Sequence, residues 1–156
     1  MNDIVIDTNV LLHTSNTKNK YYQSANKTLN LVLKKDLFLC VDDVFNIIES
    51  RNTSVIGSEY HSKIRSGTFA YAFLIDRLSK EKYVIIEKKK FNNIKKELIK
   101  NIKNRHDITF VIVAYGSQDK KLVSNDYDDF NKENRKYISK KFQVSILDSD
   151  EYALTK

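Results

Sequence analysis

The sequence has no proline, only three glycines and a single cysteine, Cys40, in 156 residues. A lone cysteine excludes an intramolecular disulfide framework and a multi-cysteine zinc site. No apolar run reaches the length of about 18 residues that a membrane-spanning helix needs, so we expect no membrane partner. The first residues lack the basic start and long apolar stretch of a secretion signal, and a cytoplasmic, reducing setting is the resulting expectation.

The scarcity of proline and glycine also leaves no segment that looks like a linker, and no internal repeat is visible. We therefore expect one domain over residues 1–156. Hydrophobic residues make up 41% of the chain. A chain of this length buries roughly two-thirds of its unfolded surface, so it can form a core without disulfides or a structural metal.

Basic residues are concentrated in one part of the chain. The segment from Lys82 to Arg105 contains nine basic and two acidic residues, and its net charge of +7 equals that of the whole chain. One interpretation is a surface that binds a polyanion such as nucleic acid. The other is a lysine-rich helix face that is merely solvated.

Apolar runs alternate with amphipathic stretches along the sequence. Strands are predicted at 3–6, 37–41, 83–86, 121–124 and 143–147, and helices at 21–35, at 58–79 with a break near Ser66-Gly67, and at 129–140. Asp42 or Asp43 is expected to cap a further helix whose apolar face is Val44, Ile47 and Ile48. Phe91, Ile94, Leu98 and Ile102 lie on one face of another helix.

The stretch from Ile108 to Tyr115 is apolar on nearly all sides, which predicts a central, buried helix. Strands that alternate with helices favour an α/β fold with three layers, α/β/α, and a mostly parallel central sheet. Right-handed crossovers are expected between its strands.

Four acidic residues lie where such a fold places a site. Asp7 and Asp126 follow two predicted strands, and the carboxyl ends of parallel strands open onto the same edge of the sheet. Asp107 begins the buried helix, and Glu49 ends the helix after the second strand. Each acid alone could be a helix cap or a surface residue. Together they would repel one another unless a cation neutralised them, and oxygen ligands suit Mg²⁺ or Mn²⁺.

These segments resemble the motifs of the PIN domain family of metal-dependent nucleases. Ile4–Leu12 is similar to the opening strand with its acid and asparagine, and Val44–Glu49 to the second motif, an apolar helix that ends in glutamate. His106–Ala114 is similar to the third motif, and Leu122–Phe130 to the fourth. The resemblance extends over nearly the whole chain and includes a closing strand at 144–147.

The resemblance implies a PIN-like fold and endonucleolytic hydrolysis of phosphodiester bonds, usually in RNA. The implied catalytic and metal-binding acids are Asp7, Glu49, Asp107 and Asp126, with Mg²⁺ or Mn²⁺ as cofactor. The fourth motif has one extra residue, which leaves open whether Asp128 or Asp129 supports the metal; Asp129 is taken as the further ligand. Should Glu49 point to solvent, Glu59 is the next candidate.

Substrate binding is predicted for residues around these acids. Asn9 and Ser124 would hydrogen-bond carboxylates or phosphate. An acidic centre repels RNA, so basic residues must supply the affinity. The candidates are Lys88, Lys89, Lys95 and Lys96. No histidine is needed as a base, although His106 next to Asp107 could contact substrate.

Small PIN domains are often toxins of toxin–antitoxin pairs, so an antitoxin protein is a predicted partner, and a homodimer is a further family expectation. The alternative function is a non-catalytic PIN-like module that binds RNA or a protein. Such a module would normally have lost one or more of the four acids, and the sequence has a candidate for each.

Overall fold

The computed structural model describes residues 2–155 and has an α/β architecture. Its five strands are β1 (Asp3–Ile6), β2 (Phe38–Asp42), β3 (Tyr83–Ile86), β4 (Lys121–Val123) and β5 (Ser145–Leu147). They form one sheet in the order β3-β2-β1-β4-β5, and every neighbouring pair is parallel. All five carboxyl ends therefore meet at one edge of the sheet.

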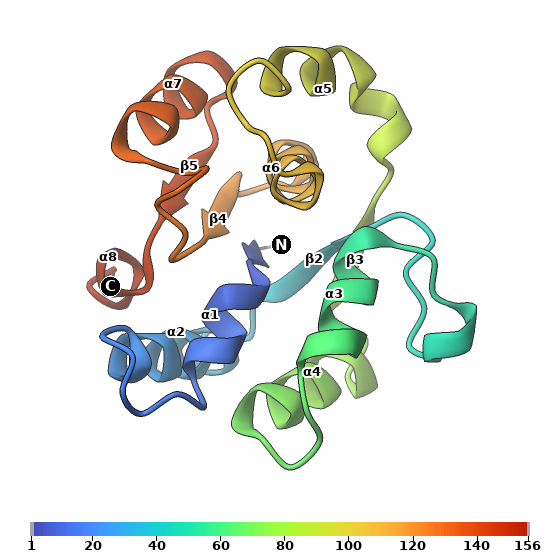
Figure 1. The fold of residues 1–156 in the computed structure, drawn as a ribbon. Coiled ribbons are helices and arrows are strands. Elements are labelled where there is room, and N and C mark those ends of the chain that lie inside the picture. The colour runs from blue at the N-terminus through green and yellow to red at the C-terminus, as the bar shows by residue number, and fades with distance from the viewer. Residues whose placement is uncertain (1, 156) are drawn as a thin grey trace.

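Eight α-helices in the described residues surround this sheet. They are α1 (Thr8–His13), α2 (Tyr22–Lys34), α3 (Val55–Lys63), α4 (Phe69–Ser79), α5 (Asn92–Leu98), α6 (Arg105–Gly116), α7 (Lys132–Phe142) and α8 (Ser149–Ala153). Two short 3₁₀ helices, η1 (Glu49–Arg51) and η2 (Lys88–Phe91), lie in the connections. Figure 1 shows α5, α6 and α7 on one side of the sheet and α1 to α4 on the other, which confirms the three-layer prediction.

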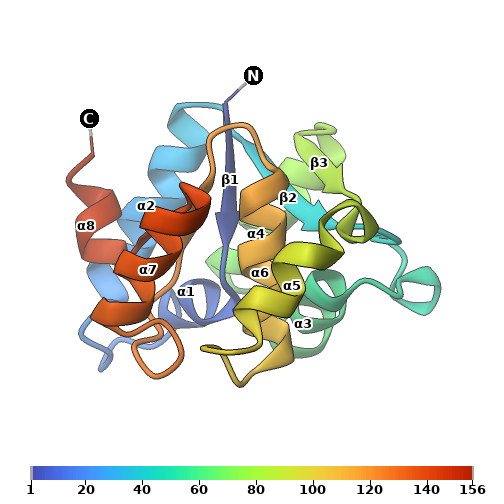
Figure 2. The ribbon, with the colours of Figure 1, turned by 90° about the horizontal axis from the view of Figure 1, so that it is seen from above.

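The buried apolar residues form one continuous core around the central strand β1, whose Ile4, Val5 and Ile6 are inaccessible to solvent. Helix α6 packs against β1, β2 and β4 and lies beside β1 in the view from above (Figure 2). Residues Ile108 to Ala114 of α6 are all buried, as their apolar pattern predicts. No helix within residues 2–155 is long and apolar enough to cross a membrane.

The chain order of the strands creates a switch point next to β1. From β1 the chain passes to β2 and β3 on one side and only later to β4 and β5 on the other. In open parallel sheets, the crevice at such a point is the usual position of a binding site. Asp7, directly after β1, and Asp126, shortly after β4, flank it.

The predicted helix that begins after Asp42 is absent. Val44 instead adopts a left-handed conformation with φ of 62°, which is uncommon for a β-branched residue. The chain then forms a loop that protrudes beyond α3 and carries the short η1 (Figure 1). In this loop, the side chains of Asn46 and Asn52 accept hydrogen bonds from the backbone N–H groups of Ile48 and Asn46. Such local side-chain acceptors compete with helix formation.

Two short helices were not predicted. Helix α1 has only six residues, so its apolar pattern is too short to distinguish it from the turn expected at Asp7-Thr8-Asn9. Helix α8 begins with a capping box in which Asp148 and Glu151 each accept a hydrogen bond from the other's backbone N–H. The spacing of these two acids is the sequence signal that could have revealed α8.

Candidate functional site

Asp7 lies at the centre of the candidate site, buried at the carboxyl end of β1. Its Oδ2 atom accepts a hydrogen bond from the Ser124 hydroxyl at 2.6 Å and another from the Asn9 amide at 2.7 Å. Burial raises the pKa of Asp7 to about 6, against the lowering effect of these hydrogen bonds, and the charge of Asp126 raises it further. Asn9 and Ser124 therefore hold this carboxylate in place. Hydrogen bonding to a carboxylate is one of the two roles predicted for them from the sequence, and contact with phosphate is the other.

Asp107 lies in the first turn of α6 and is also buried. Burial is the largest cause that raises its pKa to about 8, followed by the charge of Asp7. A hydrogen bond with Asp129 and the charges of Asp126 and Asp129 add to the shift. The carboxylates of Asp7, Asp126 and Asp129 therefore lie close enough to raise the pKa of Asp107, although the four aspartates come from three separate parts of the chain.

The loop after β4 supplies two of the four acids. The half-buried Asp126 accepts a hydrogen bond from the backbone N–H of Asp128. Asp129 accepts one from the backbone N–H of Asn104, just before α6, and this links the loop to the helix that carries Asp107. Asp128 is exposed and is not among the groups that shift the pKa of Asp107. Of the two candidates in the fourth motif, Asp129 is thus the one that the fold brings to the cluster.

Glu49 does not join this cluster. It is exposed on η1, at the tip of the loop that protrudes beyond α3 (Figure 1). Glu59 on α3, the second candidate, is buried and contacts Lys63 at 2.7 Å and the Nδ1 atom of His106 at 2.5 Å. Burial opposes ionisation of Glu59, but these two partners outweigh it and hold its pKa below the usual value. The partner His106 is adjacent in sequence to Asp107.

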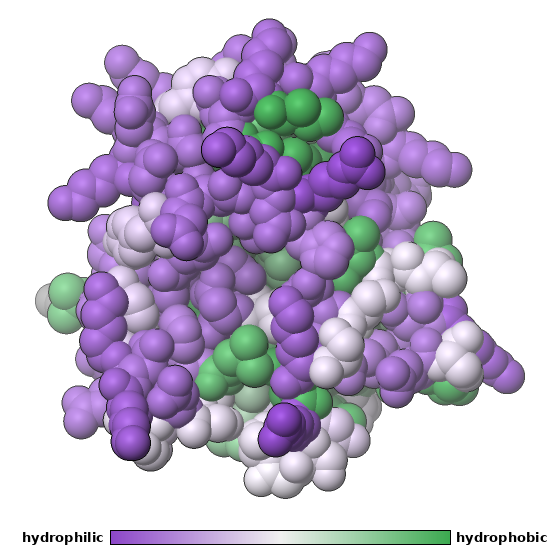
Figure 3. All heavy atoms as spheres, viewed as in Figure 1, coloured by the Kyte–Doolittle hydropathy of each residue, from purple (hydrophilic) through white to green (hydrophobic). Residues whose placement is uncertain are grey.

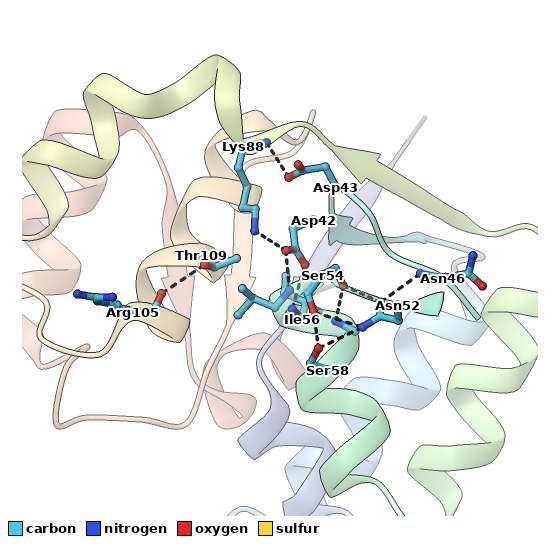
Figure 4. A network of polar contacts seen from close by, with 12 residues as sticks. Asp42, Asp43, Asn46, Asn52, Ser54, Ile56, Ser58, Lys88, Arg105 and Thr109 are labelled. Atoms are coloured by element: carbon cyan, nitrogen blue, oxygen red, sulfur yellow. Dashed lines mark hydrogen bonds and ion pairs between the residues drawn. The ribbon is translucent and has the colours of Figure 1, made fainter. Parts of the chain in front are cut away.

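Asp42 explains both the lost helix and the position of Glu59. This fully buried carboxylate at the end of β2 accepts hydrogen bonds from the backbone N–H groups of Val55 and Ile56. It therefore caps α3 rather than a helix that begins at residue 44. Figure 4 shows this network, in which the Lys88 ammonium also contacts Asp42 at 2.7 Å.

Side chains of the protruding loop complete the start of α3. Ser54 accepts a hydrogen bond from the N–H of Gly57 and donates one to Asn52 (Figure 4). A Cβ atom at Gly57 would lie 2.2 Å from the Asn52 Oδ1 atom and 2.5 Å from the Ser54 Oγ atom, so a larger residue would displace these two side chains. The loop thus anchors the helix that presents Glu59.

Arg135 on α7 is a buried residue of the site that sequence reasoning missed. Its guanidinium donates hydrogen bonds to the carbonyl oxygens of Ser124, Asp126 and Phe130 at 3.0, 2.8 and 2.6 Å. It also lies 4.1 Å from the ring centroid of Tyr127. These contacts fix the backbone on both sides of Asp126. An arginine in a lysine-rich helix carries no sequence signal for this role, because its partners are carbonyl groups of a separate loop.

The four predicted substrate-binding lysines fall into three groups. Lys88 is engaged by the buried Asp42 and is not free to bind phosphate. Lys89 and Lys95 are exposed and line a groove beside α6, whereas Lys96 is exposed but lies outside that groove. Judged from the sequence, neighbouring lysines are equally good candidates for substrate binding, and only the fold distinguishes between them.

The cluster presents oxygen atoms alone at its centre, and these are the ligands that suit a hard divalent cation. Within residues 2–155, no three side chains of His, Cys, Asp or Glu are placed as they would be around a bound metal ion. The feature of the site that favours a bound cation is instead the electrostatic state of its acids. Burial and neighbouring carboxylates raise the pKa values of Asp7 and Asp107, so a nearby positive charge would favour ionisation of these two acids.

Comparisons with known proteins add no identification. Nothing matches this chain among protein-family models, curated proteins or solved structures. The resemblance to the PIN family therefore rests on the sequence motifs alone, and the function has to be argued from the geometry of the site.

Proposed function

We propose that the protein is a Mg²⁺- or Mn²⁺-dependent endoribonuclease of the PIN type. The observation that carries this proposal is the meeting of Asp7, Asp107, Asp126 and Asp129 at the switch point of the sheet, with pKa values of about 6 and about 8 at the first two. Perturbed acids in a crevice are typical of functional sites.

The chain's own residues have distinct roles in this proposal. Asp7, Asp107 and Asp126 would hold the cation, with Asp129 beside them and Glu59 in the role predicted for Glu49. Ser124 and Asn9 keep the Asp7 carboxylate in one orientation. A divalent ion at such a site lowers the pKa of water and neutralises charge on the phosphoryl oxygens. The side chains would then position the ion and supply fixed negative charge, and none of them would act as a general base.

His106 and Lys63 hold Glu59 in the described arrangement. Lys63 contacts the Oε2 atom and His106 the Oε1 atom, so Glu59 would have to release one of these partners to act as a ligand. His106 is half exposed, which leaves it able to contact the substrate beside the acids. We assign it no proton-transfer role.

A matched pair of variants tests the proposal. Asp7→Asn should abolish RNA cleavage in Mn²⁺, whereas Asp128→Asn, which removes the same charge from an exposed position two residues after Asp126, should leave cleavage within about twofold of the wild type. Electrophoresis of a labelled single-stranded RNA measures both. Equal activity of wild type and Asp7→Asn would refute the proposal.

The second candidate is a non-catalytic module that binds RNA or a protein. It is favoured by the finding that, in residues 2–155, no three acids are already placed around a common metal position. Titration with Mn²⁺, followed by calorimetry, separates the two candidates, because the module requires no metal. An antitoxin partner, a homodimer and a cytoplasmic setting stay predictions from the sequence.

A further inference from the structure

The last peptide unit of β1, between Ile6 and Asp7, is held from two sides. In the sheet, β1 lies between β2 and β4. The N–H group of Asp7 donates a hydrogen bond to the carbonyl oxygen of Val123 on β4 at 2.9 Å. The carbonyl oxygen of Ile6 accepts a hydrogen bond from the hydroxyl of Tyr60 on α3 at 2.6 Å. A side chain 54 residues away therefore anchors the backbone next to Asp7.

Tyr60 acts where β2 separates from β1. The register pairs β1 with β2 as far as Ile4 and with β4 as far as Ile6. Alternate residues of a strand direct their backbone N–H and C=O groups to the same neighbouring strand. The carbonyl of Asn2 accepts a hydrogen bond from the N–H of Phe38, so the carbonyl of Ile6 also faces the β2 side. The hydroxyl of Tyr60 thus supplies a donor to this carbonyl beyond the registered part of β2.

The environment of Tyr60 keeps its hydroxyl protonated and able to donate. The side chain is buried, with 4% of its surface exposed. Burial raises the pKa of Tyr60 well above its usual value, and the charges of Asp7 and Asp42 raise it further. These two acids lie at the carboxyl ends of β1 and β2. Loss of the hydroxyl would remove a hydrogen bond from a buried carbonyl group, which is costly.

Helix α3 reaches two parts of the acidic site through consecutive residues. Glu59 contacts His106 at the start of α6, and Tyr60 contacts the end of β1. Consecutive side chains of a helix point about 100° apart, so one turn of α3 can contact both elements. The helix thus links the strand that ends at Asp7 with the helix that carries Asp107.

We propose that Tyr60 is a positioning residue of the acidic site, an inference that rests on the proposed nuclease function. The orientation of the peptide unit before Asp7 sets the direction in which the Asp7 side chain leaves the backbone. Asn9 and Ser124 then hold the carboxylate itself. Tyr60 acts through the carbonyl of Ile6 and contacts no reacting atom. The alternative is a hydrogen bond that only stabilises the fold.

The test variant is Tyr60→Phe, which removes one hydroxyl and keeps the ring. Its matched control is Thr14→Val. The hydroxyl of Thr14 is also buried and also donates to a main-chain carbonyl, that of Leu11, at 2.6 Å. Thr14 lies at the far end of α1 from Asp7. Both substitutions keep the buried volume, so both variants are expected to fold and to unfold at somewhat lower urea concentrations than the wild type.

Neither substitution alters the surface of the protein, because both hydroxyls are buried. Hydrophilic side chains cover most of the face drawn in Figure 3, and all of them are retained in both variants. The KM for RNA should therefore stay within about twofold of the wild-type value in both. A defect in metal binding or in the cleavage rate can then be assigned to the acidic site.

Calorimetry with Mn²⁺ and cleavage at saturating RNA, with Mn²⁺ near the wild-type dissociation constant, measure that defect. Tyr60→Phe should weaken Mn²⁺ binding and slow cleavage by at least about tenfold, the usual loss when a group that orients a metal ligand is removed. Thr14→Val should leave both within about twofold of the wild type, because it orients no acid of the site. Equal behaviour of the two variants would overturn the inference.

Hydrogen exchange, followed by NMR in EDTA, tests the anchoring of Asp7 without metal or activity. In Tyr60→Phe, the Asp7 amide should exchange about tenfold faster than the loss of global stability explains, because its peptide unit has lost one of two anchors. The Leu39 amide, which donates to the Lys82 carbonyl at 3.0 Å, is the internal reference. In Thr14→Val, the two amides should change together. Unchanged exchange at Asp7 relative to Leu39 in Tyr60→Phe would overturn the inference.

Failure of this inference and failure of the proposed function give different results. If the wild type neither binds Mn²⁺ nor cleaves RNA, the nuclease proposal fails, and hydrogen exchange alone decides whether Tyr60 positions Asp7. If the wild type cleaves RNA and Tyr60→Phe binds Mn²⁺ and cleaves equally well, the inference fails and the nuclease proposal stands. That holds even if exchange at Asp7 is faster, because the bond would then anchor the end of the strand without affecting the site.

Discussion

Replacement of Asp107 by asparagine should stabilise the metal-free protein, and the gain should grow with pH. The pKa of Asp107 is about 8 in the folded state against 3.8 for the free side chain. Between about pH 4 and about pH 8, the folded protein therefore holds a proton that the unfolded chain has already released. Wild-type stability falls with rising pH across this window, whereas asparagine has no proton to lose.

The size of the effect follows from the same pKa difference. Each tenfold change in the acid dissociation constant corresponds to about 1.4 kcal/mol, so the rise in pKa from 3.8 to about 8 sets an upper bound of about 6 kcal/mol on the gain in stability above pH 8. Water entry and the movement of four neighbouring acids away from one another reduce such penalties substantially. We expect Asp107→Asn to be more stable than the wild type by about 1–3 kcal/mol above about pH 8 and by nearly nothing at about pH 4.

Urea unfolding in EDTA, followed by circular dichroism at a series of pH values, measures this difference. Asp128→Asn is the control, because it removes an exposed carboxylate from the same region and should show no pH-dependent gain. Addition of Mn²⁺ should stabilise the wild type, by about 2.7 kcal/mol at a hundredfold excess over the dissociation constant, but stabilise Asp107→Asn less. A difference in stability that does not vary with pH would refute the reasoning, because it would mean that Asp107 is ionised without penalty.

Three further predictions concern positions where the structure differs from or adds to the sequence interpretation. Glu59→Gln should weaken Mn²⁺ binding and cleavage at least tenfold, whereas Glu49→Gln should leave both unchanged by calorimetry and gel assay; the reverse result would restore Glu49 to the site. Lys88→Met should lower the free energy of unfolding by about 2 kcal/mol in urea, because it leaves the buried Asp42 without its counter-charge, and an unchanged stability would show that the backbone N–H groups suffice. Arg135→Lys should lower Mn²⁺ affinity as well as stability, since lysine cannot bridge three carbonyl groups. Unchanged Mn²⁺ affinity would mean that Arg135 does not position Asp126.

The sequence was sufficient to predict the structure where a local pattern is compatible with only one stable conformation. The three-residue apolar run Ile4–Ile6 before Asp7 predicts a buried strand, and the stretch after Asp107, apolar on nearly all sides, predicts a buried helix. The alternation of such elements predicts the parallel sheet, and the sheet predicts that Asp7 and Asp126 lie at one edge. The fold class and these site positions follow from periodicity alone.

The segment from Val44 to Glu49 shows where this reasoning fails. Its apolar residues have helical spacing, but Val44, Ile47 and Ile48 are all exposed. The cap expected at its start, Asp42, binds the N–H groups of α3 instead, more than ten residues further along the chain. Helical spacing reports only that a helix would have an apolar face, not that the fold has a surface to cover that face.

Tertiary structure alone decided which charged residues act together. Glu59 and Glu49 are chemically identical, and so are Lys95 and Lys96, yet one member of each pair lies at the site or groove and the other does not. The sequence states the charge of each side chain directly, because that charge is a local property. Burial, ion pairing and the shifted pKa values of Asp7 and Asp107 instead arise from groups distant in the chain. The sequence determined the chemistry that this protein has available, and the packing of α3, α6 and the loop after β4 determined where that chemistry is concentrated.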